Sequence, residues 1–306
     1  MSEPQTTHSR RIAHSLWWAA AVGIVCLVAG VAWGWTCAKQ RTAALEKLNN
    51  VKLRTPGYLP GWLSSQWPLW ACEVLEVHGT TPEEWPALAT LTEVETVSFV
   101  DADLTDAGLR SLRRMRRLQH LEFILGRGIT DAGLAHLAGS PQLTELMLDQ
   151  VNITDASLSM IGRLPKLERL RVYLSNVTGS GLPELAHAKH LRSLDIRIDE
   201  EPARCLESLD RLEALEELRL AGRGIRNASL SPLRLPPRVR SLDLSRAEVG
   251  DTQDPDLVEL LAAVPGIDQI AVLNLSLNVI SRETKARLCT RLGMTEKSPG
   301  LFERSP

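Results

Sequence analysis

A period of about 24 residues runs through most of this chain and constrains its fold more than any other feature. Aligned on the first apolar residue, successive units begin at Val94, Leu118, Leu143, Leu167, Leu191 and Leu215. A degenerate unit precedes them at Cys72, a longer one starts at Val239, and a last one starts at Ile270. Because the same apolar spacing recurs, we expect about nine copies of one structural element, stacked between residues 72 and 292.

Each unit combines two kinds of apolar spacing. In the unit that starts at Leu118, Leu121 and Phe123 occupy the fourth and sixth positions, an alternation typical of a strand. Leu134 and Leu137 follow at a spacing of three, which places both on one face of a short helix. One unit cannot bury both faces alone, whereas stacked units can. The pattern therefore predicts an α/β solenoid, with a curved parallel sheet inside and short helices outside.

One long apolar segment lies near the N-terminus. Between Arg11 and Lys39 the chain carries no Asp, Glu, Lys or Arg, and residues 15–35 are almost all apolar. A helix of about 20 residues crosses a bilayer core, and tryptophan rings favour the two membrane interfaces. A cleaved signal peptide is the alternative, but its apolar region is usually only about 7 to 15 residues long. We expect a transmembrane helix over residues 15–36, with interfacial Trp17, Trp18, Trp33 and Trp35.

Basic residues are more numerous after this segment than before it. Arg10 and Arg11 precede it, whereas Lys39, Arg41, Lys47, Lys52 and Arg54 follow it. The positive-inside rule then favours the cytoplasm for the repeats, although long domains often cross a membrane regardless of this bias. Unpaired cysteines agree with a cytoplasmic location.

The remaining boundaries follow from composition. Residues 1–14 form an N-terminal tail, and a rough helical stripe before residue 54 predicts a stalk helix. A Pro- and Gly-containing stretch then breaks this helix, and the tryptophans up to residue 71 suit a cap over the first repeat better than a membrane contact. We therefore expect a stalk and cap over residues 37–71 and a flexible tail over residues 293–306.

The repeat motif, LxxLxL followed by ITDAGL, resembles leucine-rich repeats of the cysteine-containing and ribonuclease-inhibitor-like types. Together with the apolar N-terminal segment, the chain resembles membrane-anchored leucine-rich-repeat proteins of planctomycete bacteria. The resemblance implies the solenoid fold and a binding role, and it implies no reaction. The chain lacks the cysteine-rich caps and the regular position-nine asparagine of extracellular receptor-type repeats, so a receptor function is not implied.

A Thr-Asp pair recurs in three successive units. It occupies Thr105-Asp106, Thr130-Asp131 and Thr154-Asp155 and decays to Thr178-Gly179. A catalytic carboxylate is not normally copied in every repeat. Thr is a favoured N-cap, and Asp in the first turn faces the positive end of the helix dipole. The pair therefore predicts the start of each outer helix rather than an active site.

Composition and motifs exclude several functional classes. The net charge of −2 gives no sign of nucleic-acid binding. The five cysteines are widely spaced, with no CxxC pair and no histidine at zinc-ligand spacing, so we interpret them as free thiols. No nucleophile elbow, P-loop or HExxH motif occurs. We expect no catalytic residue, metal or cofactor.

The concave side of the sheet is the expected binding surface for a protein or peptide. Side chains at the third, fifth and seventh positions of each unit point towards it. These residues include His120, Glu122, Glu145, Met147, Asp149, Arg169, Arg171, Tyr173, Asp195, Arg197, Glu217 and Arg219.

Two interpretations of the concave charges remain open. Neighbouring strands lie about 4.8 Å apart, so Arg171, Asp195, Arg219 and Asp243 can form a charge ladder that satisfies itself. The same ladder can also be part of a ligand site. Glu122, Glu145 and Asp149, beside Arg169 and Tyr173, have fewer expected partners and make the better binding candidates.

An arginine-rich segment lies on the outer helix of the second unit. It contains Arg110, Arg113, Arg114, Arg116 and Arg117. Such a patch is commonly a solvated face, but it can also contact anionic lipid head groups or nucleic-acid phosphates. No aromatic residue interleaves with it to stack on bases.

Three functions follow. The first is a membrane-tethered, non-catalytic module that binds a protein or peptide on its concave face. The second is a structural role in the cell envelope with no discrete ligand. The third is an adaptor like the leucine-rich-repeat proteins that recruit substrates to ubiquitin ligases, but no F-box-like segment precedes the repeats and the expected anchor argues against it.

Overall fold

The computed structural model describes residues 51–54, 74–78, 87, 90–92, 94–101, 104–200, 205–251 and 255–304. Within them the strands form one sheet in the order β1-β2-β3-β4-β5-β6-β7-β8-β9-β11-β13-β12, with β10 paired to β8. The strands are β1 (Val51–Arg54), β2 (Val74–His78), β3 (Thr96–Val100), β4 (His120–Ile124), β5 (Glu145–Asp149), β6 (Arg169–Tyr173), β7 (Ser193–Arg197), β8 (Glu217–Arg226), β9 (Ser241–Asp243), β10 (Ala247–Glu248), β11 (Val272–Asn274), β12 (Met294–Ser298) and β13 (Leu301–Arg304).

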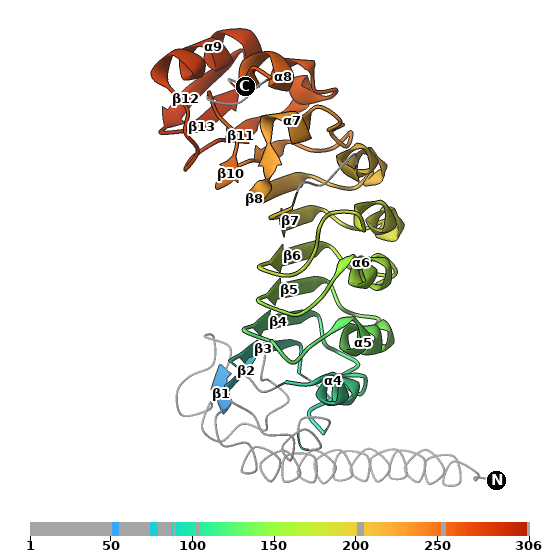
Figure 1. The fold of residues 1–306 in the computed structure, drawn as a ribbon. Helices are drawn as coiled ribbons and strands as arrows, with labels where there is room; N and C mark the ends of the chain where they lie inside the picture. Colours follow the sequence, from blue (N-terminus) through green and yellow to red (C-terminus); the bar gives the residue numbers. More distant parts are fainter. Residues whose placement is uncertain are drawn as a thin grey trace, which may run out of the picture.

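The helices form a second column beside the strands (Figure 1). The α-helices are α4 (Asp106–Leu112), α5 (Asp131–Leu134), α6 (Asp155–Ile161), α7 (Asn227–Leu230), α8 (Leu257–Ala263) and α9 (Arg282–Leu292). Several units have a 3-10 helix instead of an α-helix or after it: η3 (Ala135–Gly139), η4 (Leu182–His187), η5 (Cys205–Arg211) and η6 (Ile267–Gln269). The described chain is thus an α/β solenoid of stacked units, as the repeat predicts, with the parallel sheet and the helices on opposite sides.

The register of the parallel strands follows the repeat. Leu121 on β4 is aligned with Leu146 on β5, and Leu146 with Leu170 on β6. Each of the nine units recognised in the sequence supplies one parallel strand, β2 to β9 and β11. Equivalent apolar side chains therefore lie on top of one another along the stack.

The core lies between the strands and the helices. Burial alternates along β4 and β5, where the fourth and sixth positions of the unit are buried and their neighbours partly exposed. Leu134 and Leu137 of the outer segment are fully buried too, as the helical spacing predicts. The rings of Phe99 and Phe123 stack 5.4 Å apart at 8°. The predicted inward and outward faces are confirmed.

The solenoid begins with a strand where the sequence predicts the end of a stalk helix. Val51–Arg54 forms β1, which pairs antiparallel with β2, so the helical prediction is wrong for these residues. A helix there would leave the backbone groups of the outer edge of β2 without partners, and β1 provides them. The rest of the predicted stalk and cap, residues 37–50 and 55–71, lies outside the described residues.

The solenoid ends in a hairpin rather than a flexible tail. β13 pairs antiparallel with β11, and β12 pairs antiparallel with β13. Phe302 on β13 is fully buried and Met294 on β12 is 3% exposed, so the hairpin extends the core past the last repeat. The prediction of a flexible tail is wrong for residues 293–304, because an uncovered β11 would expose the last core layer and an unpaired sheet edge.

The predicted transmembrane helix, residues 15–36 with Trp17, Trp18, Trp33 and Trp35, lies outside the described residues. Among the helices that the structure describes, none has the length and apolarity needed to span a bilayer. Cys205 and Cys289 are free thiols, and the other three cysteines lie outside the described ranges.

Candidate functional site: the concave surface

The recurring Thr-Asp pairs connect one repeat to the next. Asp106 accepts hydrogen bonds from the backbone N–H and the hydroxyl of Thr130, at 2.8 and 2.6 Å. Asp131 accepts the same two bonds from Thr154, at 2.9 and 2.7 Å, and a third from the Ser157 hydroxyl. These carboxylates are therefore fully engaged in architecture, in agreement with the structural interpretation of the motif.

Asp155 continues this series. It accepts bonds from the Thr178 hydroxyl at 2.7 Å and from the backbone N–H groups of Thr178, Gly179 and Gly181 at 3.1, 3.1 and 2.9 Å. Burial opposes ionisation of Asp131 and Asp155, but the hydrogen bonds outweigh it and lower the pKa of both carboxyl groups. Both side chains therefore act as charged acceptors at neutral pH.

The helix-start prediction is confirmed in all three units, where helices begin at Asp106, Asp131 and Asp155, and a side-chain cap forms in two of them. The hydroxyls of Thr130 and Thr154 accept hydrogen bonds from the N–H groups of Ala132 and Ala156, whereas Thr105 makes no side-chain cap. The sequence pattern predicts that the aspartates face the helix dipole, but it does not predict their bonds across the repeat boundary. Their 24-residue recurrence was the signal that could have revealed them, because equivalent positions of adjacent repeats are neighbours in space.

The predicted charge ladder exists on β6 to β9. Arg171 donates to Asp195 at 2.9 Å, Arg219 lies 3.7 Å from Asp195, and Arg219 also lies 3.7 Å from Asp243. Asn274 on β11 extends the series by donating to Asp243 at 3.0 Å. Alternating charges on adjacent strands thus neutralise one another along this part of the concave face.

Tyr173 belongs to the charge ladder. Its hydroxyl donates to Asp195 at 2.6 Å, and the guanidinium groups of Arg171 and Arg219 each lie 5.9 Å from its ring centre. Burial and the bond to Asp195 both raise the pKa of this phenol above its ordinary value. Asp195 is only 7% exposed, and its carboxylate accepts bonds from Arg171 and Tyr173 while Arg219 lies 3.7 Å away. The contacts of Asp195 agree with the self-satisfied interpretation of the ladder, whereas the shielded Nε atom of Arg219 donates no hydrogen bond to a described residue.

Arg197 does not join the ladder. Its guanidinium donates to Asp199 at 2.9 Å, and Asp199 also accepts the backbone N–H of Arg223 at 3.2 Å. The bond from Arg197 lowers the pKa of Asp199, and the same bond raises the pKa of Arg197. Arg197 is therefore part of a separate contact at the end of β7.

The other predicted site residues gather on β4, β5 and β6. Glu145 lies between two nitrogen-bearing side chains, 2.9 Å from the guanidinium of Arg169 and 3.5 Å from the imidazole of His120. The bond to Glu145 raises the pKa of Arg169. Their side chains remain a third to a half exposed, so this group is accessible from solvent. Glu145 has more partners than the sequence suggested.

Glu122 and Asp149 flank this group without a cationic partner among the described residues. Glu122 accepts a hydrogen bond from the Ser98 hydroxyl at 2.8 Å. The Oδ1 atom of Asp149 is shielded from solvent and accepts no hydrogen bond. Met147 lies between them on the sheet, because its register partners are Glu122 on β4 and Arg171 on β6. We call Glu122, Met147 and Asp149 the acidic patch.

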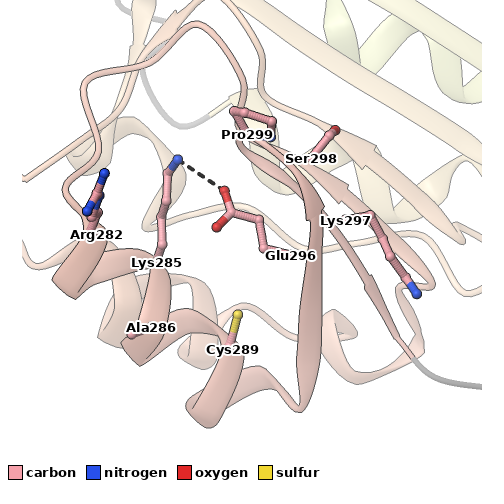
Figure 2. A pocket seen from close by; sticks show the side chains of 8 residues that line it. All are labelled: Arg282, Lys285, Ala286, Cys289, Glu296, Lys297, Ser298 and Pro299. Atoms are coloured by element: carbon pink, nitrogen blue, oxygen red, sulfur yellow. Dashed lines mark ion pairs between the residues drawn. The ribbon is translucent and has the colours of Figure 1, made fainter.

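A separate hollow lies at the C-terminal end of the described chain. It measures about 630 Å³ and lies between α9 and β12 (Figure 2). Lys285 forms an ion pair of 3.0 Å with Glu296 across it, and Glu296 also accepts the backbone N–H of Gly300 at 2.8 Å. These two contacts lower the pKa of Glu296. This hollow was not predicted, because residues 293–306 were expected to form a flexible tail.

Among the described residues, no group of three or more His, Cys, Asp or Glu side chains is arranged to hold a metal ion. The concave surface offers hydrogen-bond donors, acceptors and one thioether, which suits non-covalent recognition.

Comparisons with known proteins add no family. No protein-family model matches the chain, and no curated protein matches it. Among solved structures, an internalin (inlF) from Listeria monocytogenes is similar with a TM-score of 0.44 and 22% identity, covering 76% of this chain and 69% of that one. An internalin C2 (inlC2) from the same organism is similar with a TM-score of 0.46 and 21% identity, covering 69% of this chain and 84% of that one.

Proposed function

We propose that this chain is a non-catalytic binding module, tethered to a membrane through residues 15–36, that takes a protein or peptide on the concave face of β4, β5 and β6. The acidic patch is the main support for this proposal. It places two carboxylates that have no cationic partner among the described residues beside a thioether and an accessible polar group, Glu145 with Arg169 and His120.

The unpaired Oδ1 atom of Asp149 supports binding at this point of the sheet. A polar atom that is shielded from water and has no partner costs about 1–3 kcal/mol. A donor from a bound partner would remove this cost. Charged groups arranged in this way favour a partner with basic or N–H donor groups, and they steer its approach.

The charge ladder, by contrast, gives β7 to β9 little to offer a partner. Asp195 already accepts bonds from Arg171 and Tyr173. A ligand charge would have to break these contacts before making its own. The proposal therefore places recognition at the N-terminal half of the described sheet and gives the ladder a structural role.

A pair of isosteric substitutions tests the proposal. Glu122→Gln with Asp149→Asn removes two negative charges from the acidic patch and keeps side-chain size. The matched control is Glu184→Gln with Glu207→Gln, which removes two charges from exposed residues of η4 and η5 on the outer side. Tyr173 is left unchanged because its hydroxyl holds Asp195.

Affinity capture of the tagged full chain from its native membranes, with quantitative mass spectrometry, is the measurement. We expect a partner whose recovery falls about tenfold or more with the patch variant, the effect of losing one or two charged contacts, and stays constant with the control. If both variants recover the same partners as the wild type in the same yield, concave recognition fails, and the envelope role without a discrete ligand is favoured.

Membrane attachment has its own test. Carbonate extraction should leave the full chain in the membrane fraction, and a variant lacking residues 15–36 should be released. Protease added outside intact cells should spare the repeats, because we propose the cytoplasmic side. Digestion of the repeats from outside contradicts that orientation without affecting the proposal about the concave face.

A further inference from the structure

The arginine-rich segment of the second unit forms a continuous basic surface on the helical side of the solenoid. Arg110 belongs to α4, and the other four arginines lie in the turn that follows it, close to the N-terminal end of the helix column (Figure 1). We call these five residues the arginine patch: Arg110, Arg113, Arg114, Arg116 and Arg117. All five side chains are exposed.

The backbone fixes the direction of the arginine patch. Leu112 and Met115 are each 1% exposed, so the turn is anchored in the core at two points and its arginines point outwards. The N–H of Met115 donates to the carbonyl of Leu112 at 2.9 Å. The Arg113 side chain lies against Gly139 of the next unit, where an added Cβ would approach it to 3.2 Å. The backbone that carries the patch is therefore anchored in the core.

Little negative charge neutralises the arginine patch. Arg117 forms an ion pair of 3.2 Å with Glu95, whereas the other four arginines form none with any described residue. Residues 104–166 contain six carboxylates. Three of them, Glu122, Glu145 and Asp149, belong to the sheet, and the other three hold adjacent repeats together. The outer side of these units therefore carries an excess of positive over negative charge, which Arg163 and Lys166 extend into the unit of α6.

We infer that the arginine patch binds the anionic head groups of a phospholipid bilayer. Guanidinium groups pair well with phosphate oxygens, and basic clusters near a membrane segment are attracted to anionic lipids. The apolar segment ends at Trp35 and β1 begins at Val51. Even fully extended, that connection spans only about 55 Å, so a membrane holding residues 15–35 keeps this end of the solenoid near its surface.

Nucleic acid is the competing anion, and the surface fits it less well. Binding of single strands uses aromatic side chains on which bases stack. Phe123 is the one aromatic residue between 104 and 166, and it is fully buried in the core. The surface thus offers charge without stacking platforms, which suits lipid head groups.

The test uses the full chain reconstituted into vesicles that contain lipids with a nitroxide quencher on the head group. A fluorescent amino acid is introduced at Ala107, an exposed position of α4, or at Ala263, an exposed position at the end of α8. The vesicles are either phosphatidylcholine alone or phosphatidylcholine with a third phosphatidylserine. Fluorescence quenching then reports how close each end of the solenoid lies to the head groups.

We expect quenching at position 107 to increase with phosphatidylserine and to be lost at about 1 M salt, where charges are screened beyond roughly 3 Å. Position 263 should show no such change. The fourfold substitution of Arg110, Arg113, Arg114 and Arg116 by Gln should abolish the increase, because each arginine near an anionic surface contributes about fivefold to its local partitioning. A control that replaces four other exposed arginines by Gln should retain it: Arg211, Arg234, Arg238 and Arg282.

Equal quenching in both vesicle types, or an increase that survives the patch substitution, would overturn the inference. A gel-shift assay with a 30-nucleotide DNA and RNA forms the second arm. Patch-dependent oligonucleotide binding without lipid-dependent quenching would assign the surface to nucleic acid instead. Failure of the chain to enter phosphatidylcholine vesicles would contradict the proposed anchor, and the quenching in anionic vesicles would still decide the role of the patch.

Discussion

Replacement of Asp131 by Ala is expected to weaken the boundary between two neighbouring repeats. The substitution removes three hydrogen bonds, two from Thr154 and one from Ser157. The Thr154 groups are near solvent, so water replaces their partner and each loss costs about 0.5–1 kcal/mol. Ser157 is 1% exposed, and its unpaired hydroxyl costs about 1–3 kcal/mol. The free energy of unfolding should fall by about 2–5 kcal/mol in total.

Urea unfolding of the full chain in detergent, followed by circular dichroism, measures this loss. The control is Asp210→Ala on η5, an exposed carboxylate that makes no bond to a described residue and should change stability by less than about 0.5 kcal/mol. The pH dependence is a second readout. Because the folded state lowers the pKa of Asp131, the advantage of the wild type is full above the ordinary aspartate pKa of 3.8. It should shrink as pH falls through the lower native pKa. Equal losses in both variants would refute the connecting role of the carboxylate.

Three further predictions concern other parts of the solenoid. Asn227→Asp should lower the free energy of unfolding in urea by about 3 kcal/mol or more. The buried Asn227 amide donates to the carbonyls of Gly250 and Pro255, at 2.8 and 2.9 Å, and a carboxylate there would repel them. Stability equal to the wild type would contradict this. Phe302→Ala should cost about 3–5 kcal/mol and speed hydrogen exchange first in the C-terminal units, a prediction that uniform destabilisation would contradict. Asp195→Ala should lower the pKa of Tyr173, one of the two tyrosines in the chain, by removing a bond that helps raise it; an unchanged tyrosinate titration by ultraviolet absorbance would argue against that contact.

The repeat made the fold predictable from the sequence. Leu121 and Phe123 are buried and His120 and Glu122 partly exposed, as period-two spacing requires. Because every unit repeats the same apolar spacing, that spacing predicts all nine parallel strands and which of their side chains face the core. The two ends of the sheet have no copies to compare, so neither β1 nor the hairpin of β12 and β13 could be recognised. Both are defined by the open edge that they cover, which is a property of the assembled stack.

The position of the candidate site on the concave face could be predicted from the sequence, but the contacts between its side chains could not. The spacing identified which residues face the concave side and that Arg171, Asp195 and Arg219 alternate in charge. Side-chain conformations then decide which groups meet. Tyr173, expected beside Glu122, Glu145 and Asp149, donates instead to Asp195. Glu145 gains contacts with Arg169 and with the imidazole of His120. Glu122 and Asp149 remain without cationic partners among the described residues, a result that a one-dimensional pattern cannot provide.

Photo-crosslinking from the centre of the acidic patch tests whether a protein binds the concave face. A photoreactive amino acid replaces Met147 on β5 or, as the control, the exposed Ala135 on the outer side, and the full chain is irradiated in its native membranes. The account predicts a discrete crosslinked protein from position 147 that is absent from position 135 and is lost with Glu122→Gln and Asp149→Asn. No specific product at position 147, or the same products from both positions, would contradict recognition by the concave face.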